Sequence, residues 1–169
     1  MQIQIRAEQV TDIEPITDLT QAAFADVEYS SHTEHLIVNA LRVREKLTLS
    51  LVAVIDDQLV GHVAISPVRL SSGNAGWYGL GPISVQPELQ GKGIGRALMH
   101  EVLQQLKALG AAGCVLLGDP NYYQKFGFKA YAQLSLADVP PEYFQAIIFT
   151  GTVPQAEVFY DEAFYVEAE

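Results

Sequence analysis

A glycine-rich loop between a predicted strand and a predicted long helix constrains the fold of this chain more than any other feature. The stretch Ser84–Met99 reads SVQPELQGKGIGRALM, with a strand ending near Val85 and a helix beginning near Gly93. Glycines would let the backbone approach a ligand closely there, because no Cβ intervenes. The first N–H groups of a helix lack partners within the helix and sit at the positive end of its dipole. The loop therefore predicts a site for a phosphate or pyrophosphate.

Two common phosphate-binding loops do not match this stretch. A P-loop requires Lys-Ser or Lys-Thr after its last glycine, whereas Gly95 is followed by Arg96. The dinucleotide-binding fingerprint requires Gly or Ala at its third glycine position. That position holds Arg96 when counted from Gly91 and Leu98 when counted from Gly93. Taken alone, the glycines are also consistent with an ordinary helix start that binds no ligand.

The segments around the loop predict a mixed α/β layer structure. Residues 11–14, Thr-Asp-Ile-Glu, have the pattern of a capping box at the start of a helix. Pro82 cannot donate to a sheet ladder, so it marks an edge, a bulge or a break in the pairing of its strand. The spacing of apolar residues predicts strands over residues 2–6, 49–55, 59–70, 77–85, 114–117, 146–149 and 157–160, a hairpin turn at residues 56–58, and helices over residues 13–25, 31–44, 93–109 and 122–126.

Composition favours one folded domain over residues 1–169. Hydrophobic residues make up 49% of the chain and charged residues 18%, which is enough apolar material for a full core. No apolar run approaches the roughly 20 residues that a membrane helix needs, so no membrane association is expected. The N-terminus alternates like a strand, without the apolar core of a signal peptide, and the single Cys114 cannot form an internal disulfide. These features favour the cytoplasm.

The charge is unevenly distributed along the chain. The net charge is −10, so no general attraction to nucleic acid is expected. Residues 91–137 nevertheless carry a net charge of +3, and the rest of the chain carries −13. This division indicates an anionic ligand at the basic segment and a cationic one elsewhere. A helix with a charged solvent face is the alternative. The basic residues of the segment are Lys92, Arg96, Lys107, Lys125 and Lys129.

Two motifs resemble those of the GNAT acetyltransferases. Residues 90–95, Gln-Gly-Lys-Gly-Ile-Gly, are similar to the family's Gln/Arg-x-x-Gly-x-Gly/Ala loop, and Val85 and Pro87 stand before them in the usual arrangement. Residues 123–128, Tyr-Gln-Lys-Phe-Gly-Phe, are similar to its Tyr-x-x-x-Gly-Phe segment. The two motifs stand in the family's order and are separated by one predicted helix and one predicted strand.

Further segments resemble a bacterial subgroup of predicted members, the YhbS-like acetyltransferases. The resemblance covers nearly the whole chain and is weakest over residues 26–46. One departure concerns the asparagine that many members place after the strand before the tyrosine helix. This chain has Gly118 to Pro120 there, so Asn121 is not assigned that role. The segments that resemble the subgroup are Gly79–Pro82, Asp119–Tyr123, Pro141–Phe144 and Tyr160 ahead of Ala163-Phe164.

The resemblance implies a fold, a reaction and a cofactor site. The implied fold is the GNAT type, with a mixed, largely antiparallel central sheet flanked by helices and a splayed pair of cofactor-binding strands. The implied reaction transfers the acetyl group of acetyl-CoA to a primary amine of a small molecule or peptide, without a metal. The loop amides would hold the pyrophosphate, and the preceding strand would line the pantetheine arm. The implied cofactor-binding residues are Ile83, Ser84, Val85, Gln90, Gly91, Lys92, Gly93, Ile94, Gly95 and Arg96.

The resemblance also makes Tyr123 the candidate general acid that protonates the departing thiolate. A packed aromatic beside Phe126 and Phe128 is the alternative, and Tyr122 is expected to be structural. An ammonium with a pKa of about 10.4 must lose a proton before it attacks. The sequence leaves the base open among polar residues on or just before the second predicted helix. These candidates are Glu28, His32, Glu34 and His35.

The other histidines and the cysteine have structural explanations. His32 and His35 stand three residues apart, but no third metal ligand is evident, so no metal is expected. His62 in a strand and His100 on a helix are expected to be structural. Cys114 lies in an apolar strand and is expected to be buried and inert.

The region from Asp26 to Leu41 is the expected acceptor site, with Glu28 and Glu34 as its candidate substrate residues. An acidic exterior that only aids solubility is the alternative there. Two other functions stay open: a sensor that binds acetyl-CoA without turnover, and an interaction module that does not bind it. The sequence leaves open a monomer or a homodimer, the acceptor amine, and acetyl or longer acyl donors.

Overall fold

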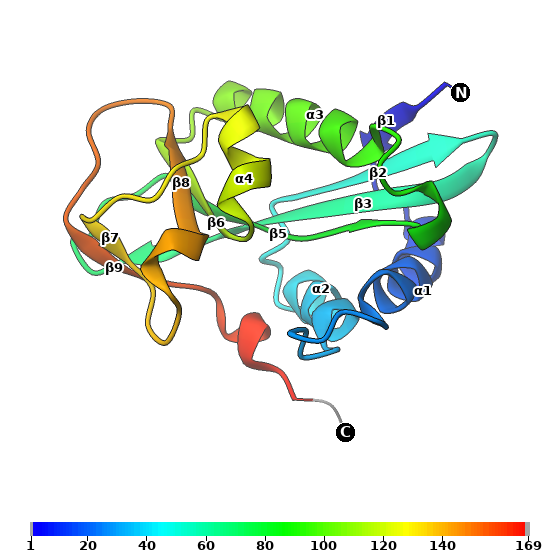
Figure 1. Cartoon of the computed structure of the whole chain (residues 1–169), viewed down its shortest axis with the longest axis horizontal. Coiled ribbons are helices and arrows are strands. Elements are labelled where there is room, and N and C mark those ends of the chain that lie inside the picture. The colour runs from blue at the N-terminus through cyan, green and yellow to red at the C-terminus, as the bar shows by residue number, and fades with distance from the viewer. Residues whose placement is uncertain (1, 168–169) are drawn as a thin grey trace.

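A central six-stranded sheet organises the computed structural model, which describes residues 2–167 (Figure 1). Met1 and residues 168–169 of the predicted domain lie outside the described residues. All neighbouring strands are antiparallel except β5 and β6, which are parallel, so the predicted mixed, largely antiparallel sheet is confirmed. The strand order is β1 (Gln4–Ala7), β2 (Leu49–Ile55), β3 (Gln58–Pro67), β5 (Trp77–Val85), β6 (Gly113–Leu117) and β8 (Phe144–Ile148).

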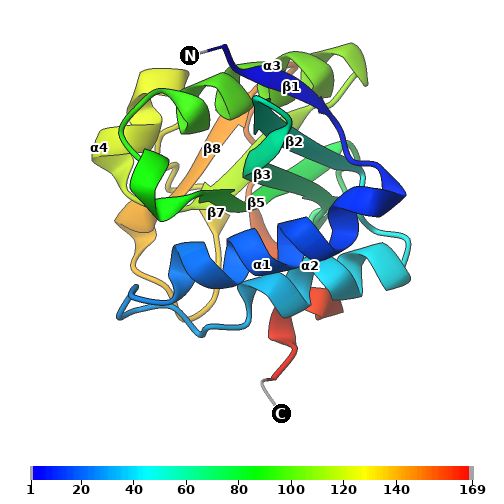
Figure 2. The same ribbon diagram turned by 90° about the vertical axis from the view of Figure 1, so that its right-hand side faces the viewer.

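Helices cover both faces of this sheet. Figure 2 shows α3 (Ile94–Ala108) on one face and α1 (Ile13–Phe24) and α2 (Glu34–Val43) side by side on the other. Leu98, Val102 and Leu106 of the predicted apolar stripe are fully buried and join the largest core cluster. The fourth predicted stripe residue, Leu109, lies just after the helix and is 54% exposed. On the opposite face Ile16 of α1 and Val38 of α2 pack against the β2 residues Val52 and Val54. The predicted helices therefore form, with ends shifted by at most three residues.

The first helix begins differently from the prediction. A 3-10 turn, Val10–Asp12, precedes α1, and the backbone N–H of Gln9 donates to Asp12 Oδ2 at 2.7 Å. Asp12 also accepts two hydrogen bonds from the Arg6 guanidinium, at 2.6 and 3.2 Å. The predicted capping box beginning at Thr11 is therefore wrong, because Asp12 accepts from Gln9 and so caps the preceding turn.

The hairpin between β2 and β3 turns on two aspartates. Asp56 and Asp57 have φ of 50° and 62°, which is the backbone of a tight two-residue hairpin turn. Gln58 pairs with Ile55 and belongs to β3, so the turn is one residue shorter than predicted.

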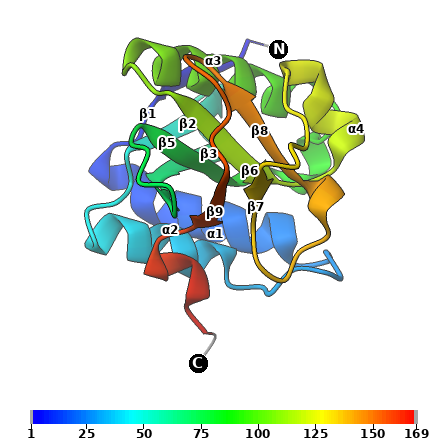
Figure 3. The same ribbon diagram turned by 90° about the vertical axis from the view of Figure 1, so that its left-hand side faces the viewer.

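A small second sheet lies beside the first (Figure 3). The predicted strand over residues 59–70 divides at Pro67, which cannot continue the ladder as a donor. Its last residues form β4 (Arg69–Leu70), which pairs with β9 (Ala156–Phe159). The sequence did not predict β7 (Leu134–Ser135), which pairs with β9 from the other side. The chain then enters a 3-10 turn, Glu162–Tyr165, that contacts α2.

The parallel strands β5 and β6 separate after three residue pairs. They pair from Trp77 to Gly79, after which the residues of β5 have no partner strand on that side within the described residues. The register with β3 shifts between Val63 and Ile65, opposite the segment that contains Pro82. Pro82 therefore lies where the pairing of β5 is irregular, as expected. The register shift with β3 occurs beside the part of β5 that has separated from β6.

Within residues 2–167, no helix has the length and apolar character needed to cross a membrane.

Candidate active site

The glycine loop holds its backbone open toward solvent. Gly91 and Gly93 have φ of 76° and 90°, and a Cβ added to either would meet no heavy atom within 4 Å. Gly93 is the N-cap of α3, and the Ala97 N–H makes the first bond of this turn, to the Gly93 carbonyl at 3.0 Å. The side-chain amide of Gln90 donates to the Val85 carbonyl at 3.2 Å, which ties the loop to the end of β5. The N–H groups before Ala97 therefore have no partners inside the helix, and they lie beside the open space around Gly91 and Gly93.

A cavity of about 530 Å³ lies over this loop. Two residues predicted for the cofactor, Ser84 and Lys92, are not among those that line it. Ser84 is buried between Ile83 and Val85 on the opposite face of the strand, because side chains alternate along a strand. Lys92 is exposed. The lining residues are Ile83, Val85, Leu89, Gln90, Gly91, Gly93, Ile94, Gly95, Arg96, Tyr122 and Tyr123.

Tyr122 and Tyr123 close one side of this cavity. They lie on the single turn α4 (Pro120–Tyr123), which Asp119 caps by accepting the Asn121 N–H at 2.9 Å. Their rings meet edge to face with centroids 4.9 Å apart. The Tyr122 hydroxyl lies 3.2 Å from the position that a Cβ on Gly95 would take. Tyr122 therefore lies against the start of α3 and lines the cavity. The sequence predicted only a structural role for it.

The position of Tyr123 depends on a glycine at the end of β6. A Cβ on Gly118 would lie 2.4 Å from Cε2 of the Tyr123 ring, so the ring rests directly against the backbone. Burial, with smaller effects of Tyr122, Tyr29 and Asp119, raises the pKa of Tyr123 to about 12. The phenol is therefore protonated at neutral pH and is chemically fit to donate a proton, not to accept one.

A second cavity, of about 570 Å³, shares a wall with the first. The shared wall consists of Ile83, Tyr122 and Tyr123. The remaining lining is mostly apolar and aromatic, with two carboxylates, Glu34 and Asp119. Its other lining residues are Phe24, Tyr29, Ile37, Leu80, Gly81, Pro82, Leu116, Leu117, Gly118, Leu136, Ala137, Val139, Tyr160, Phe164 and Tyr165.

Among the acidic and histidine candidates, the structure brings only Glu34 to this second cavity. The Ser30 hydroxyl donates its single proton to the Glu34 carboxylate, with Oγ 2.8 Å from Oε1 and 2.7 Å from Oε2. Glu28 is exposed and, like His32 and His35, is absent from the lining. Of the two predicted acceptor residues, Glu34 therefore lines the cavity and Glu28 does not.

The C-terminal segment supplies a wall that the sequence analysis missed. Arg44 donates two hydrogen bonds to Asp161, at 2.7 and 3.2 Å, and Asp161 caps the following turn through the Ala163 N–H at 3.0 Å. The ring of Tyr160 packs against Gly79, where an added Cβ would lie 2.6 Å from Cε1. Phe164 lies against Tyr160 with ring centroids 4.8 Å apart. The aromatic residues of this segment are visible in the sequence, but the sequence does not show that they pack beside β5 and line a cavity.

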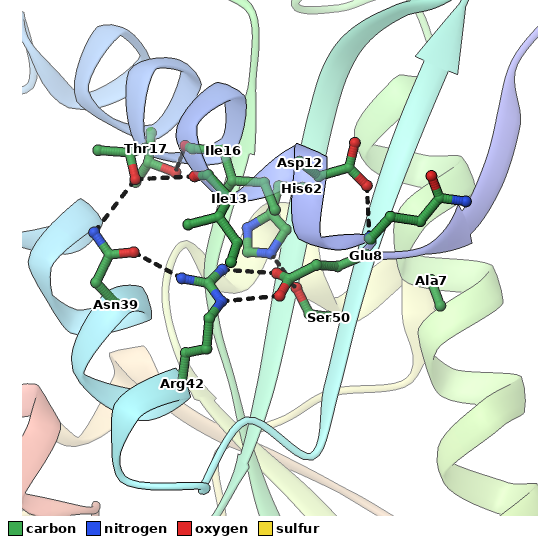
Figure 4. Close-up of polar contacts among 12 residues, drawn as sticks. Ala7, Glu8, Asp12, Ile13, Ile16, Thr17, Asn39, Arg42, Ser50 and His62 are labelled. Carbon is green, nitrogen blue, oxygen red and sulfur yellow. Dashed lines mark hydrogen bonds and ion pairs between the residues drawn. The ribbon is translucent and has the colours of Figure 1, made fainter.

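His62 belongs to a buried polar network away from both cavities (Figure 4). Ser50 Oγ donates to Glu8 at 2.6 Å, so it accepts from Nε2–H of His62 at 2.8 Å. Arg42 donates to both oxygens of Glu8, at 2.9 and 2.7 Å. Nδ1 of His62 has no partner among the described residues. Burial lowers the pKa of His62 to about 4, so the ring is neutral at pH 7, as fits the expected structural role.

Cys114 is fully buried in β6, and burial raises the pKa of its thiol. A thiol held protonated in this way is a poor nucleophile. Among residues 2–167, no group of three or more His, Cys, Asp or Glu side chains is arranged to hold a metal ion.

Comparison with known proteins identifies the class to which this fold and site belong. The family model described as the acetyltransferase (GNAT) family matches residues 13–128. The N-acetyltransferase YhbS of Escherichia coli K12 is 38% identical over 133 residues, which cover 78% of this chain and 77% of that protein. The chain therefore belongs to the acetyltransferase (GNAT) family, which confirms the predicted family and enzyme class.

Two solved structures show the same arrangement over almost the whole chain. A GNAT family acetyltransferase from Brucella melitensis, in complex with acetyl-CoA, superposes with a TM-score of 0.87 at 48% identity, covering 96% of this chain and 98% of that one. YhbS from Escherichia coli, in complex with CoA, gives a TM-score of 0.87 at 32% identity, covering 98% and 93%. The predicted GNAT-type fold is confirmed.

Proposed function

We propose that this chain transfers the acetyl group of acetyl-CoA to a primary amine. The observation that carries the proposal is the wall shared by the two cavities, formed by Ile83, Tyr122 and Tyr123. A donor in the first cavity and an amine in the second would meet at that wall, where β5 and β6 separate. Acetyl-CoA complexes of related proteins support the choice of donor.

The residues of the first cavity fit acetyl-CoA. The open backbone at Gly91 and Gly93 leaves room for a pyrophosphate, and the unpaired N–H groups at the start of α3 suit an anion. Arg96 adds positive charge at the lining. Ile83 and Val85 lie on the part of β5 that has no partner strand on the β6 side, which is where the pantetheine arm would be held. When bound, acetyl-CoA supplies an acetyl thioester.

Tyr123 is the proposed general acid of the reaction. Its pKa of about 12 keeps the hydroxyl protonated, so it can deliver a proton to the departing thiolate sulfur. Glu34 is the proposed contact for the ammonium, since it is the carboxylate of the predicted acceptor region that lines the second cavity. The amine would lose its proton to Glu34 or to water before attack.

The experiment that tests the proposal measures acetyl-CoA binding and amine-dependent CoA release in parallel. Release of CoA that requires both the enzyme and a primary amine, with formation of the N-acetylated amine, supports acetyl transfer. Tight acetyl-CoA binding without CoA release across a broad amine panel would favour the sensor function instead.

A further inference from the structure

We infer that the acceptor is a small organic cation whose primary amine is carried on an apolar body, aromatic or branched aliphatic. The inference rests on the proposed function and deepens it by giving the second cavity a substrate class. It combines three features of that cavity: its apolar lining, its two carboxylates, and two aromatic side chains exposed at its edge.

The apolar lining comes from several separate parts of the chain. The region before α2 contributes Phe24 and Tyr29, and β5 contributes Leu80 and Pro82. The helices α2 and α4, the end of β6, the segment around β7 and the C-terminal segment supply the rest. A volume of about 570 Å³ is that of a small-molecule site. A ligand that buries apolar surface there gains affinity in proportion to the area removed from water.

The charge of the cavity suits an ammonium group. Asp119 and Glu34 are the charged side chains among its lining residues. Asp119 Oδ1 accepts the Asn121 N–H as the cap of α4, which leaves the second oxygen of this exposed carboxylate for a ligand. Glu34 accepts only from the Ser30 hydroxyl among the described residues, which leaves lone pairs for a ligand. A polyamine or an aminosugar would bring further polar groups into a lining that offers them few charged partners.

Two aromatic side chains stand exposed at the edge of the cavity. Tyr29 is 95% exposed and Tyr165 is 67% exposed, yet both belong to the lining. They come from segments far apart in the sequence, and the ion pair between Arg44 and Asp161 holds the C-terminal segment in place. Aromatic faces bind apolar groups and attract cations, so this pair would cover the body of the ligand.

The first arm of the test compares amines on the wild-type protein. 2-Phenylethylamine and 3-methylbutylamine are compared with ethanolamine, spermidine and a peptide with a free N-terminus. Binding to the CoA-loaded protein is measured by calorimetry, and acetylation is measured as CoA release. We expect kcat/KM for 2-phenylethylamine to exceed that for ethanolamine by at least about tenfold, as burial of a phenyl group requires.

The second arm uses variants with a matched control. Tyr29→Ala and Tyr165→Ala alter exposed side chains, so the fold should persist, and circular dichroism checks this. Each should raise the KM for 2-phenylethylamine at least about threefold, with the KM for acetyl-CoA unchanged. Tyr143→Ala is the control, because Tyr143 is a partly exposed tyrosine outside both cavities. Glu34→Gln should weaken binding of every amine, while leaving the preference for apolar bodies intact.

The outcomes separate this inference from the proposed function. Stronger binding and faster acetylation of ethanolamine, spermidine or the peptide would overturn the apolar acceptor and leave acetyl transfer standing. Calorimetric binding of apolar amines without CoA release would support the substrate class of the cavity and contradict turnover. Acetyl-CoA binding with neither amine binding nor CoA release would overturn both.

Discussion

Gly118 controls where the Tyr123 hydroxyl lies. The ring of Tyr123 occupies the space that a side chain at position 118 would need, with Cε2 2.4 Å from the added Cβ. Gly118→Ala must therefore displace the ring, and we expect kcat to fall about tenfold or more while acetyl-CoA affinity changes less. The measurement is a double-mutant cycle with Tyr123→Phe. If Gly118→Ala lowers kcat equally with and without the Tyr123 hydroxyl, then Gly118 does not act through that group.

The raised pKa of Tyr123 predicts the alkaline side of the pH–rate profile. Below the pKa of the acceptor amine, kcat/KM should rise about tenfold per pH unit, because only the neutral amine attacks. An acid with an ordinary tyrosine pKa of about 10 would lose activity above pH 10. Tyr123, with a pKa of about 12, stays protonated there, so the rate should hold to about pH 11. A decline centred near pH 10 in folded enzyme would contradict this role.

The loop before α3 is the element that binds the cofactor in our account. Gly93→Asp would place bulk and negative charge where the N–H groups face open space. Acetyl-CoA binding should weaken at least tenfold, about 1.4 kcal/mol. Gly73→Asp is a matched control, since Gly73 has a similar φ of 83° and equally open surroundings but lies outside the first cavity. If calorimetry gives the two variants equal affinities for acetyl-CoA, the loop does not bind the phosphates.

Elements with strong local signals could be predicted from the sequence, whereas elements that depend on distant partners could not. The stripe of α3 was visible locally from its period, and β2 was visible from its run of Val, Leu and Ile, which is buried on both faces. The two-residue strands β4 and β7 have no local pattern and form only by pairing with β9. For the site, the glycine loop was predictable because a helix start has its own chemistry. The aromatic wall from Tyr160 and Phe164 required the tertiary structure.

The stability of the whole molecule should depend on the buried His62. Its folded pKa of about 4 is lower than the ordinary value of 6.5, so the unfolded chain binds the proton first as the pH falls. The contribution of His62 to the free energy of unfolding should therefore be constant above about pH 6.5. This contribution should decline between pH 6.5 and 4, by at most about 1.4 kcal/mol per pH unit, and then level off.

The test of that dependence compares two histidine variants by urea unfolding across pH 4 to 7. His62→Leu removes the buried titrating group and leaves Ser50 bonded to Glu8, so the slope over this range should shrink. His100→Gln changes an exposed histidine and should keep the wild-type slope. Glu8, Asp12 and Asp161 have lowered pKa values and so add acid instability in every variant. An unchanged slope in His62→Leu would show that His62 does not titrate on unfolding as described.

The most direct test of acetyl transfer across the shared wall is CoA release by wild-type protein and Tyr123→Phe at saturating amine, with mass spectrometry of the product. We expect an N-acetylated amine from the wild type, with kcat about 10²- to 10⁴-fold lower in Tyr123→Phe and the KM for acetyl-CoA unchanged. Equal kcat values, or CoA release without an acetylated amine, would contradict it.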